Sequence, residues 1–304
     1  MATDRIMDYH GDDYGISMNN AARMLELIKA GRMDSISVIP NMTTTDEALK
    51  LLNDEWDGLA HKPKISVHIN LVDGFSLSGI EDEFFTSKLT DSDAEYKYVF
   101  HTSWAGLLLG TLIPGSKRDR IEKILTKEIR LQIDNVYSKL PKECKLRIDA
   151  HQHTQMIPVV FDAVMNAVDE LGLNDDLEFV RISREPVFPF MPITGTFPPV
   201  SLVKNILLNM LSKRNEKKLK SRGAEYGLLW GLIMTGCMDK KRVEALLPAM
   251  TKYAEKKGKT MEVLFHPGIV APDEKYAEYG PDDMEHFYSG NRDIEYDAVM
   301  NAAR

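Results

Sequence analysis

Short apolar runs alternate with longer segments of helical period along this chain, and this alternation constrains its fold most. The runs are rich in branched residues and predict strands at 5–9, 35–39, 65–71, 146–151, 178–182 and 261–266. The segments between them predict helices at 19–30, 44–52, 117–139, 159–171, 203–220 and 240–257. Because such alternation is typical of βα units, the sequence predicts an α/β fold with a parallel sheet.

Two stretches interrupt the alternation. Residues 73–116 contain scattered glycine, serine and aromatic residues, and 185–200 are rich in proline. Long irregular segments in a compact domain are often lids or binding loops. A chain of 304 residues is long enough for one large α/β domain. We therefore predict a single domain over 1–304, with these two insertions at the rim of a cleft.

Charge and cysteine content exclude several classes of protein. The chain has 46 acidic and 38 basic residues and a formal net charge of -8, which argues against a surface built for nucleic acid or anionic membrane and favours a neutral or positively charged substrate. The cysteines, Cys144 and Cys237, are far apart, so neither a disulfide framework nor a sulfur-ligated zinc site is expected. With no signal-peptide core and no apolar stretch long enough to span a membrane, we predict a soluble cytoplasmic protein.

Two adjacent carboxylates, Asp12 and Asp13, lie in a glycine-flanked segment that is predicted to be a turn between a strand and a helix. One aspartate can cap the helix, but the second leaves a charge to explain, and a metal ion is the expected counter-charge. One carboxylate would then bind the ion while its neighbour accepts a proton from water. The residues alone do not decide which does which.

Histidines near other strand ends supply further ligand candidates. Alternation in 65–71 places His68 on a polar face, where a lone histidine is usually structural. Asp149, His151 and His153 are spaced to share one face of an extended segment, and an aspartate beside ligand histidines is typical of the outer shell of a metal site. We predict a metal role for His151 or His153, with the other hydrogen-bonded to substrate or protein.

The strand predicted at 261–266 ends in His266, followed by Pro267 and Gly268. A histidine there can be a core residue with a carbonyl partner. However, active sites of barrels and open α/β sheets gather at the carboxyl ends of strands. His266 is therefore a candidate proton donor to a leaving group.

The ordered set of motifs resembles the YdjC-like family of carbohydrate deacetylases, which includes the ChbG-like chitooligosaccharide deacetylases. The family's Asn-Ala-Asp-Asp-Phe-Gly corresponds to residues 10–15, its His-x-x-Leu to 68–71, its Asp-Ser-His-x-His to 149–153, and its His-Pro to 266–267. The resemblance also covers 128–132, 180–181 and Arg292. The departure that matters most is His10, an imidazole beside the carboxylates, which bears on metal preference and substrate fit.

This resemblance implies a distorted (β/α) barrel, TIM-barrel-like, that removes the N-acetyl group from an amino sugar or short N-acetylated oligosaccharide and releases acetate. It implies one divalent cation, zinc or magnesium, bound by Asp13, His68 and His151, with Asp12 as base and His266 as acid. We expect Arg181 to keep Asp12 ionised, although an ordinary ion pair is the alternative, and Asp149 and His153 to support the ligands or contact substrate. A homodimer is also expected.

Two other functions fit the same residue types. A metal-dependent phosphoesterase also uses aspartate and histidine ligands, but such sites often hold two ions bridged by a carboxylate. A sugar-binding protein with a structural metal would instead close a four-ligand shell, with His153 as the fourth ligand. The number of ions and the consumption of substrate distinguish these hypotheses.

Overall fold

The centre of the molecule is a seven-stranded parallel sheet with the order β7-β6-β3-β2-β1-β9-β8. The computed structural model describes residues 6–89, 96–112, 114–188, 199–280 and 285–304. The strands are β1 (Met7–Tyr14), β2 (Ser35–Val38), β3 (Lys64–Ile69), β6 (Leu146–Ala150), β7 (Leu177–Val180), β8 (Leu228–Trp230) and β9 (Met261–Phe265). This arrangement confirms the α/β class.

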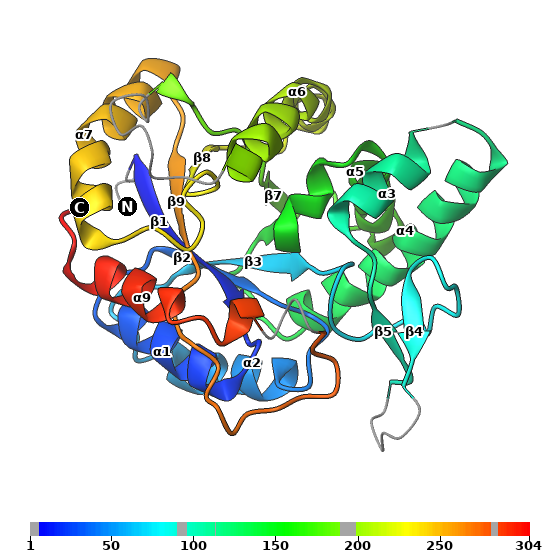
Figure 1. Cartoon of the computed structure of the whole chain (residues 1–304), viewed down its shortest axis with the longest axis horizontal. Helices are drawn as coiled ribbons and strands as arrows, with labels where there is room; N and C mark the ends of the chain where they lie inside the picture. Colours follow the sequence, from blue (N-terminus) through cyan, green and yellow to red (C-terminus); the bar gives the residue numbers. More distant parts are fainter. Residues whose placement is uncertain (1–5, 90–95, 113, 189–198, 281–284) are drawn as a thin grey trace.

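The sheet curls, but its strand ladders do not close into a barrel. Figure 1 shows the strands turning from β7 through β3 to β1, β9 and β8. Within the described ranges, the edge strand β7 meets the other edge only at an isolated parallel bridge between Phe179 and Glu225, just before β8. The predicted TIM-like barrel is therefore a curled half-barrel, because β7 and β8 are too short to extend this bridge into a ladder.

Helices cover the outside of the curled sheet (Figure 1). They are α1 (Met18–Lys29), α2 (Thr45–Trp56), α3 (Trp104–Thr111), α4 (Ser116–Tyr137), α5 (Pro158–Leu171), α6 (Pro199–Arg222), α7 (Lys240–Lys257) and α9 (Asn291–Asn301). Local signals set several ends: the Ser17 side chain caps α1 by accepting from Asn20 N, and Gly172 ends α5 in the left-handed conformation, at φ 68°. None of the helices in the described ranges combines the length and apolar character that a membrane span needs.

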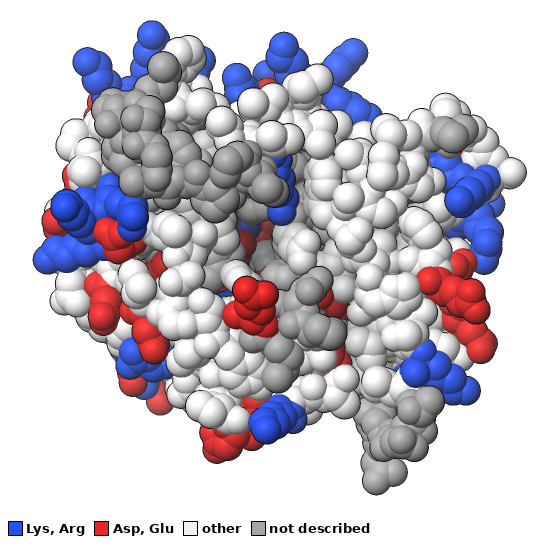
Figure 2. All heavy atoms as spheres, in the orientation of Figure 1, with Lys and Arg blue, Asp and Glu red and all other residues white. Residues whose placement is uncertain are grey.

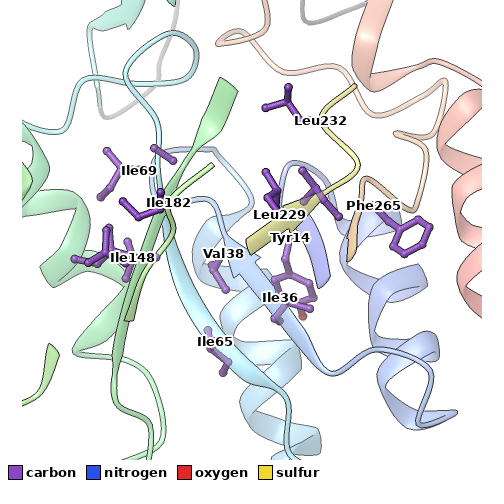
Figure 3. Close-up of a cluster of buried hydrophobic side chains, with 14 of the residues drawn as sticks. Tyr14, Ile36, Val38, Ile65, Ile69, Ile148, Ile182, Leu229, Leu232 and Phe265 are labelled. Carbon is purple, nitrogen blue, oxygen red and sulfur yellow. The ribbon is translucent and has the colours of Figure 1, made fainter. Parts of the chain in front are cut away.

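The core lies where helices meet the strands. Figure 3 shows Tyr14, Ile36, Ile65, Ile148 and Leu229, from five different strands, within one cluster of buried side chains. The strands are buried on both faces, as expected for a parallel sheet covered by helices. Polar side chains on these strands point into the curl of the sheet. Because they are buried there, they need hydrogen-bond partners.

The first insertion has more structure than its sequence predicts. Within 73–116 lie the antiparallel pair β4 (Thr86–Lys88) and β5 (Tyr98–Phe100) and the helix α3. The strands are too short to give a clear periodic signal, and 90–95 between them lie outside the described residues. Most of the second insertion, 189–198, also lies outside the described residues, so its predicted place at the rim stays a prediction.

Lysine and arginine side chains gather over α6 in Figure 2. Several belong to the basic run at 213–222 and pair with acids: Arg214 and Lys218 with Asp162, and Arg222 with Asp169. Such ion pairs are typical of a solvated helix face.

Candidate metal centre

Asp12 and Asp13 lie on β1 and not in a turn, so the predicted turn at this segment is wrong. β1 runs through Tyr14: its backbone pairs with β9 as far as Gly11, and with β2 at His10, Gly11 and again at Tyr14. Its register with β2 shifts between Gly11 and Tyr14, and Asp13 has a left-handed φ of 68°. This distortion lets the two adjacent carboxylates contact different partners.

Asp13, His68 and His151 converge at the carboxyl edge of the sheet. One candidate ligand atom from each lies within 4.8 Å of the other two, and all three residues are buried. Asp13 Oδ1 is 2.9 Å from His151 Nδ1 and 3.4 Å from His68 Nε2. The structure thus brings together the three residues that the family resemblance selects as metal ligands.

A carboxylate faces the other ring nitrogen of each of these two histidines. Asp149 Oδ1 is 2.6 Å from His68 Nδ1, and Asp73 Oδ2 is 3.0 Å from His151 Nε2. Carboxylates placed in this way fix the tautomer and orientation of an imidazole. They leave His68 Nε2 and His151 Nδ1 facing Asp13.

The prediction that Asp149, His151 and His153 share one face of a strand is wrong. β6 ends at Ala150, and a 3-10 helix follows over His151–Met156, with left-handed backbone at Gln152 (φ 52°) and His153 (φ 62°). Two-residue alternation therefore stops before the histidines. Asp149 supports His68 on the neighbouring strand, while His153 Nδ1 lies 3.0 Å from the Ser183 hydroxyl, away from the Asp13 group.

Two buried arginines, and not only a potential metal ion, supply positive charge to the aspartates. Arg181 Nη1 donates to Asp12 Oδ2 at 2.9 Å, and Arg292 Nη2 donates to Asp13 Oδ2 at 2.5 Å. Burial raises the pKa of both carboxyls, but Arg181 beside Asp12, and His151 with Arg292 beside Asp13, outweigh burial and hold both pKa values well below the usual range. Both carboxylates are therefore ionised at neutral pH.

The same carboxylates favour protonated imidazoles when no metal is bound. Burial lowers the pKa of His68, but Asp12 and Asp149 raise it to about 9. Burial likewise lowers the pKa of His151, while Asp13 raises it to about 10. A metal ion at this position would have to displace these protons.

His10 connects the aspartates to a polar network inside the curl of the sheet. Its ring nitrogens lie 2.6 Å from the Ser35 hydroxyl and 2.7 Å from the Ser37 hydroxyl, and its Nε2 is 3.0 Å from Asp12 Oδ1. Ser37 in turn donates to Asp149 Oδ2 at 2.5 Å. His10 is fully buried and contacts Asp12 rather than the Asp13 group, so it helps to position the carboxylate proposed as base.

A cavity of about 230 Å³ opens beside these residues. Its lining includes Asp12, His151 and His266, together with His153, Lys204 and His286. Burial lowers the pKa of Lys204 to about 8, and burial with the charges of Arg292 and His266 lowers the pKa of His286 to about 3. The cavity therefore joins the proposed base and acid in one space.

Asp73, Lys204 and His286 are site residues that sequence reasoning missed. Asp73 follows a strand within an irregular segment. Lys204 lies in a predicted helix among mostly apolar residues, and His286 lies in a polar stretch. The only sequence signal for Asp73 was its position two residues beyond the strand predicted at 65–71. Arg292 was noted only through the family resemblance, and its contact with Asp13 depends on the chain folding back from its C-terminal part.

The observed donors fit a divalent cation. Among the described residues, His68 Nε2 is buried without a hydrogen-bond partner, although Asp13 Oδ1 lies 3.4 Å away. A buried polar atom without a partner requires an explanation, and a bound ion is one. Two imidazoles and one carboxylate are also a ligand set found in catalytic zinc sites.

Fold and site together define an α/β protein with an aspartate–histidine centre at the carboxyl edge of a curled parallel sheet. The model of the family described as YdjC-like protein matches residues 9–303. The chain therefore belongs to the YdjC-like family, as its motifs predicted.

A solved structure agrees with this fold. A protein from Enterococcus faecalis, proposed to be a cellobiose-phosphate cleavage protein, is 13% identical with a TM-score of 0.61, over 97% of this chain and 90% of that chain. An uncharacterised protein reaches a TM-score of only 0.28 at 12% identity, over 73% of this chain and 63% of that chain, which is too low to inform the fold. No curated protein matches this chain.

Proposed function

We propose that this protein is a metal-dependent carbohydrate deacetylase, which hydrolyses the N-acetyl group of an amino sugar or short N-acetylated oligosaccharide. One observation carries the proposal: Asp13, His68 and His151 converge, while the adjacent Asp12 lies outside their group and lines the cavity. Such a centre would offer both a site for a cation and, outside that site, a carboxylate that can act as base, and amide hydrolysis needs both.

Asp13, His68 and His151 would hold the ion, oriented by Arg292, Asp149 and Asp73 respectively. When bound, a divalent ion at this position lowers the pKa of water and polarises the acetyl carbonyl. The donor set favours zinc over magnesium, because magnesium prefers oxygen ligands and keeps several waters.

Asp12 is the proposed general base. Arg181 keeps its carboxylate ionised, and both Arg181 Nη1 and His10 Nε2 hold its oxygens in place, at 2.9 and 3.0 Å. The carboxylate can thus accept a proton from the attacking water as the C–O bond forms. Arg181 acts through Asp12, so it is a positioning residue.

His266 is the proposed general acid. It follows β9 directly and lines the same cavity as Asp12. Its backbone N–H donates to Glu295 Oε2 at 2.6 Å, which fixes the backbone from which the ring projects. His266 would donate a proton to the amine nitrogen as the C–N bond breaks, so that the products are a free amino sugar and acetate.

The cavity suits one end of the substrate. At about 230 Å³ it is smaller than a typical ligand pocket of roughly 300–1,000 Å³, so it would enclose the acetylated residue and leave the rest of an oligosaccharide outside. Lys204, His153 and Thr235 in its lining can hydrogen-bond sugar hydroxyls.

The test is acetate release from N-acetylglucosamine and its dimer and trimer, with and without a chelator. We expect release that the chelator stops and zinc restores, and none from His68→Ala. The control is His61→Ala, because the His61 side chain is 47% exposed and the proposed mechanism does not use it. Release that neither the chelator nor His68→Ala affects would overturn the metal assignment.

A phosphoesterase is the second candidate, because Asp13 belongs to two potential metal-binding groups. Against it, Arg292 occupies Asp13 Oδ2, the oxygen that a bridging carboxylate would offer to a second ion. We expect no release of phosphate from phenyl phosphate. The alternative of a closed structural site is disfavoured because His153 contacts Ser183 and belongs to none of the potential groups among the described residues.

A further inference from the structure

A second potential metal-binding group lies beside the first. Asp13, His266 and His286 each offer a ligand atom within 4.8 Å of the other two. This group shares only Asp13 with the group of His68 and His151. The proposed reaction uses His266 but gives no role to His286.

The two histidines of this group are held in place by α9 and the residues before it. Their ring centroids are 5.6 Å apart, with an angle of 75° between the planes. Arg292 Nε donates to the His286 backbone carbonyl at 3.3 Å, and Glu295 accepts from the His266 backbone N–H at 2.6 Å. The backbone positions from which both imidazoles project are therefore fixed without a ligand.

Both rings line the cavity, so an ion can reach them from solvent. Within the part of the chain that the structure describes, His266 Nδ1 forms no hydrogen bond. Glu295 Oε2 lies 3.6 Å from it. Two imidazoles and a carboxylate suit zinc and similar transition metals, whereas magnesium prefers oxygen donors.

Arg292 makes this second position weaker than the first. Its Nη2 lies 2.5 Å from Asp13 Oδ2, so a cation that shares Asp13 is repelled by the guanidinium and competes with it for the carboxylate. The first ion, between His68 and His151, also repels a second one nearby. Occupation thus requires an excess of metal.

We propose that Asp13, His266 and His286 form a second, weaker zinc site whose occupation inhibits the enzyme. An ion there uses the imidazole lone pair of His266, which then cannot carry the proton for the leaving amine. The inhibitory effect rests on the proposed deacetylase function, whereas the binding of the second ion does not.

The experiment measures zinc bound per chain by equilibrium dialysis, and acetate release over the same zinc concentrations, for the wild type and His286→Gln. We expect the wild type to bind one zinc tightly and a second weakly, with activity falling as the second binds. His286→Gln should keep the tight ion. The zinc concentration that halves its activity, measured relative to its own activity without added zinc, should rise about tenfold or more. Magnesium should not inhibit.

Two controls exclude other causes. His101→Gln changes an exposed histidine and should bind and respond to zinc as the wild type does. His286→Asn repeats the loss of the imidazole with a smaller side chain, and unchanged tight binding shows that the variants fold.

The inference is overturned if the wild type binds only one zinc at any concentration, if excess zinc leaves activity unchanged or raises it, or if His286→Gln retains the second ion and its inhibition. A chain that binds two zinc ions, loses one in His286→Gln and yet releases no acetate would refute the proposed function while retaining the second site.

Discussion

Asp12 and Asp13 are neighbours in sequence but have different surroundings. Asp12 contacts Arg181 and His10. Asp13 instead faces His68, His151 and Arg292. The left-handed backbone at Asp13 allows this divergence. The sequence predicted that two adjacent acids would divide binding and proton transfer, but only the family resemblance assigned the roles, because the deciding partners come from distant segments.

Asp12→Asn should separate metal binding from turnover. The amide keeps the size of the side chain but cannot act as base, so we expect the bound metal to remain and kcat to fall by about 10²- to 10⁴-fold. Metal content and acetate release measured on one preparation check this. Loss of the metal, or turnover within a few-fold of the wild type, would contradict the assignment.

Asp73→Asn tests the carboxylate behind His151. An amide binds the His151 Nε2–H less strongly, so we expect zinc affinity to fall by about 10- to 100-fold. Competition with a chromophoric chelator measures this affinity. The matched control is Asp57→Asn, at the exposed end of α2, which should leave the zinc affinity unchanged. Equal affinities for Asp73→Asn and the control would show that Asp73 does not position the ligand.

At the scale of elements, α4 holds the segment that carries Asp73. Glu128 accepts from the Leu77 and Ser78 backbone N–H groups at 3.1 and 2.8 Å, and Gln132 bonds both the N–H and the carbonyl of Asn70. These bonds tie the loop after β3 to α4. The family resemblance pointed to 128–132, but the contacts could not be predicted from periodicity.

Glu128→Ala should therefore destabilise the protein. The two backbone N–H groups lose their acceptor, at a cost of about 1–3 kcal/mol in the free energy of unfolding. Urea unfolding measures the change, with Glu170→Ala as control because that side chain is 56% exposed on α5. A change no larger than in the control would mean that the loop does not depend on α4.

Elements with a clear apolar pattern were predictable from the sequence, and elements without one were not. The helix predicted at 240–257 coincides with α7, and the strand at 35–39 nearly coincides with β2. By contrast, β8 spans only Leu228–Trp230, and α9 has an interrupted apolar pattern, so both were missed. The residues of β1 that carry the site were assigned to a turn because Gly11, Asp12 and Asp13 are poor strand formers. Pairing with β9 as far as Gly11 and with β2 again at Tyr14 overrides this preference.

At the scale of the whole molecule, the curled sheet brings residues that are far apart along the chain to one edge. The class of fold followed from the alternating pattern, but the incomplete closure between β7 and β8 did not, because strand length at the edges depends on tertiary pairing. The charges buried at this edge also make the stability of the fold depend on pH and on whether a metal ion is bound.

The metal-free protein should lose stability at alkaline pH. In the folded protein the pKa values of His68 and His151 are raised to about 9 and 10, above the ordinary 6.5. The contribution of these two histidines to the free energy of unfolding is therefore complete below pH 6.5 and is lost as pH rises through 9 to 10. Zinc binds the neutral rings, so the increase in Tm caused by one equivalent of zinc should grow between pH 6.5 and 9. A constant or shrinking increase would contradict these protonation states.

The most direct test of the account is anomalous X-ray diffraction at the zinc edge from crystals loaded with one equivalent of zinc. We predict one strong peak about 2.0–2.2 Å from an Asp13 oxygen, His68 Nε2 and His151 Nδ1, with Asp12 not bound to it. A peak that lacks Asp13 or either histidine as a ligand, or no peak at this edge of the sheet, would contradict the proposed centre.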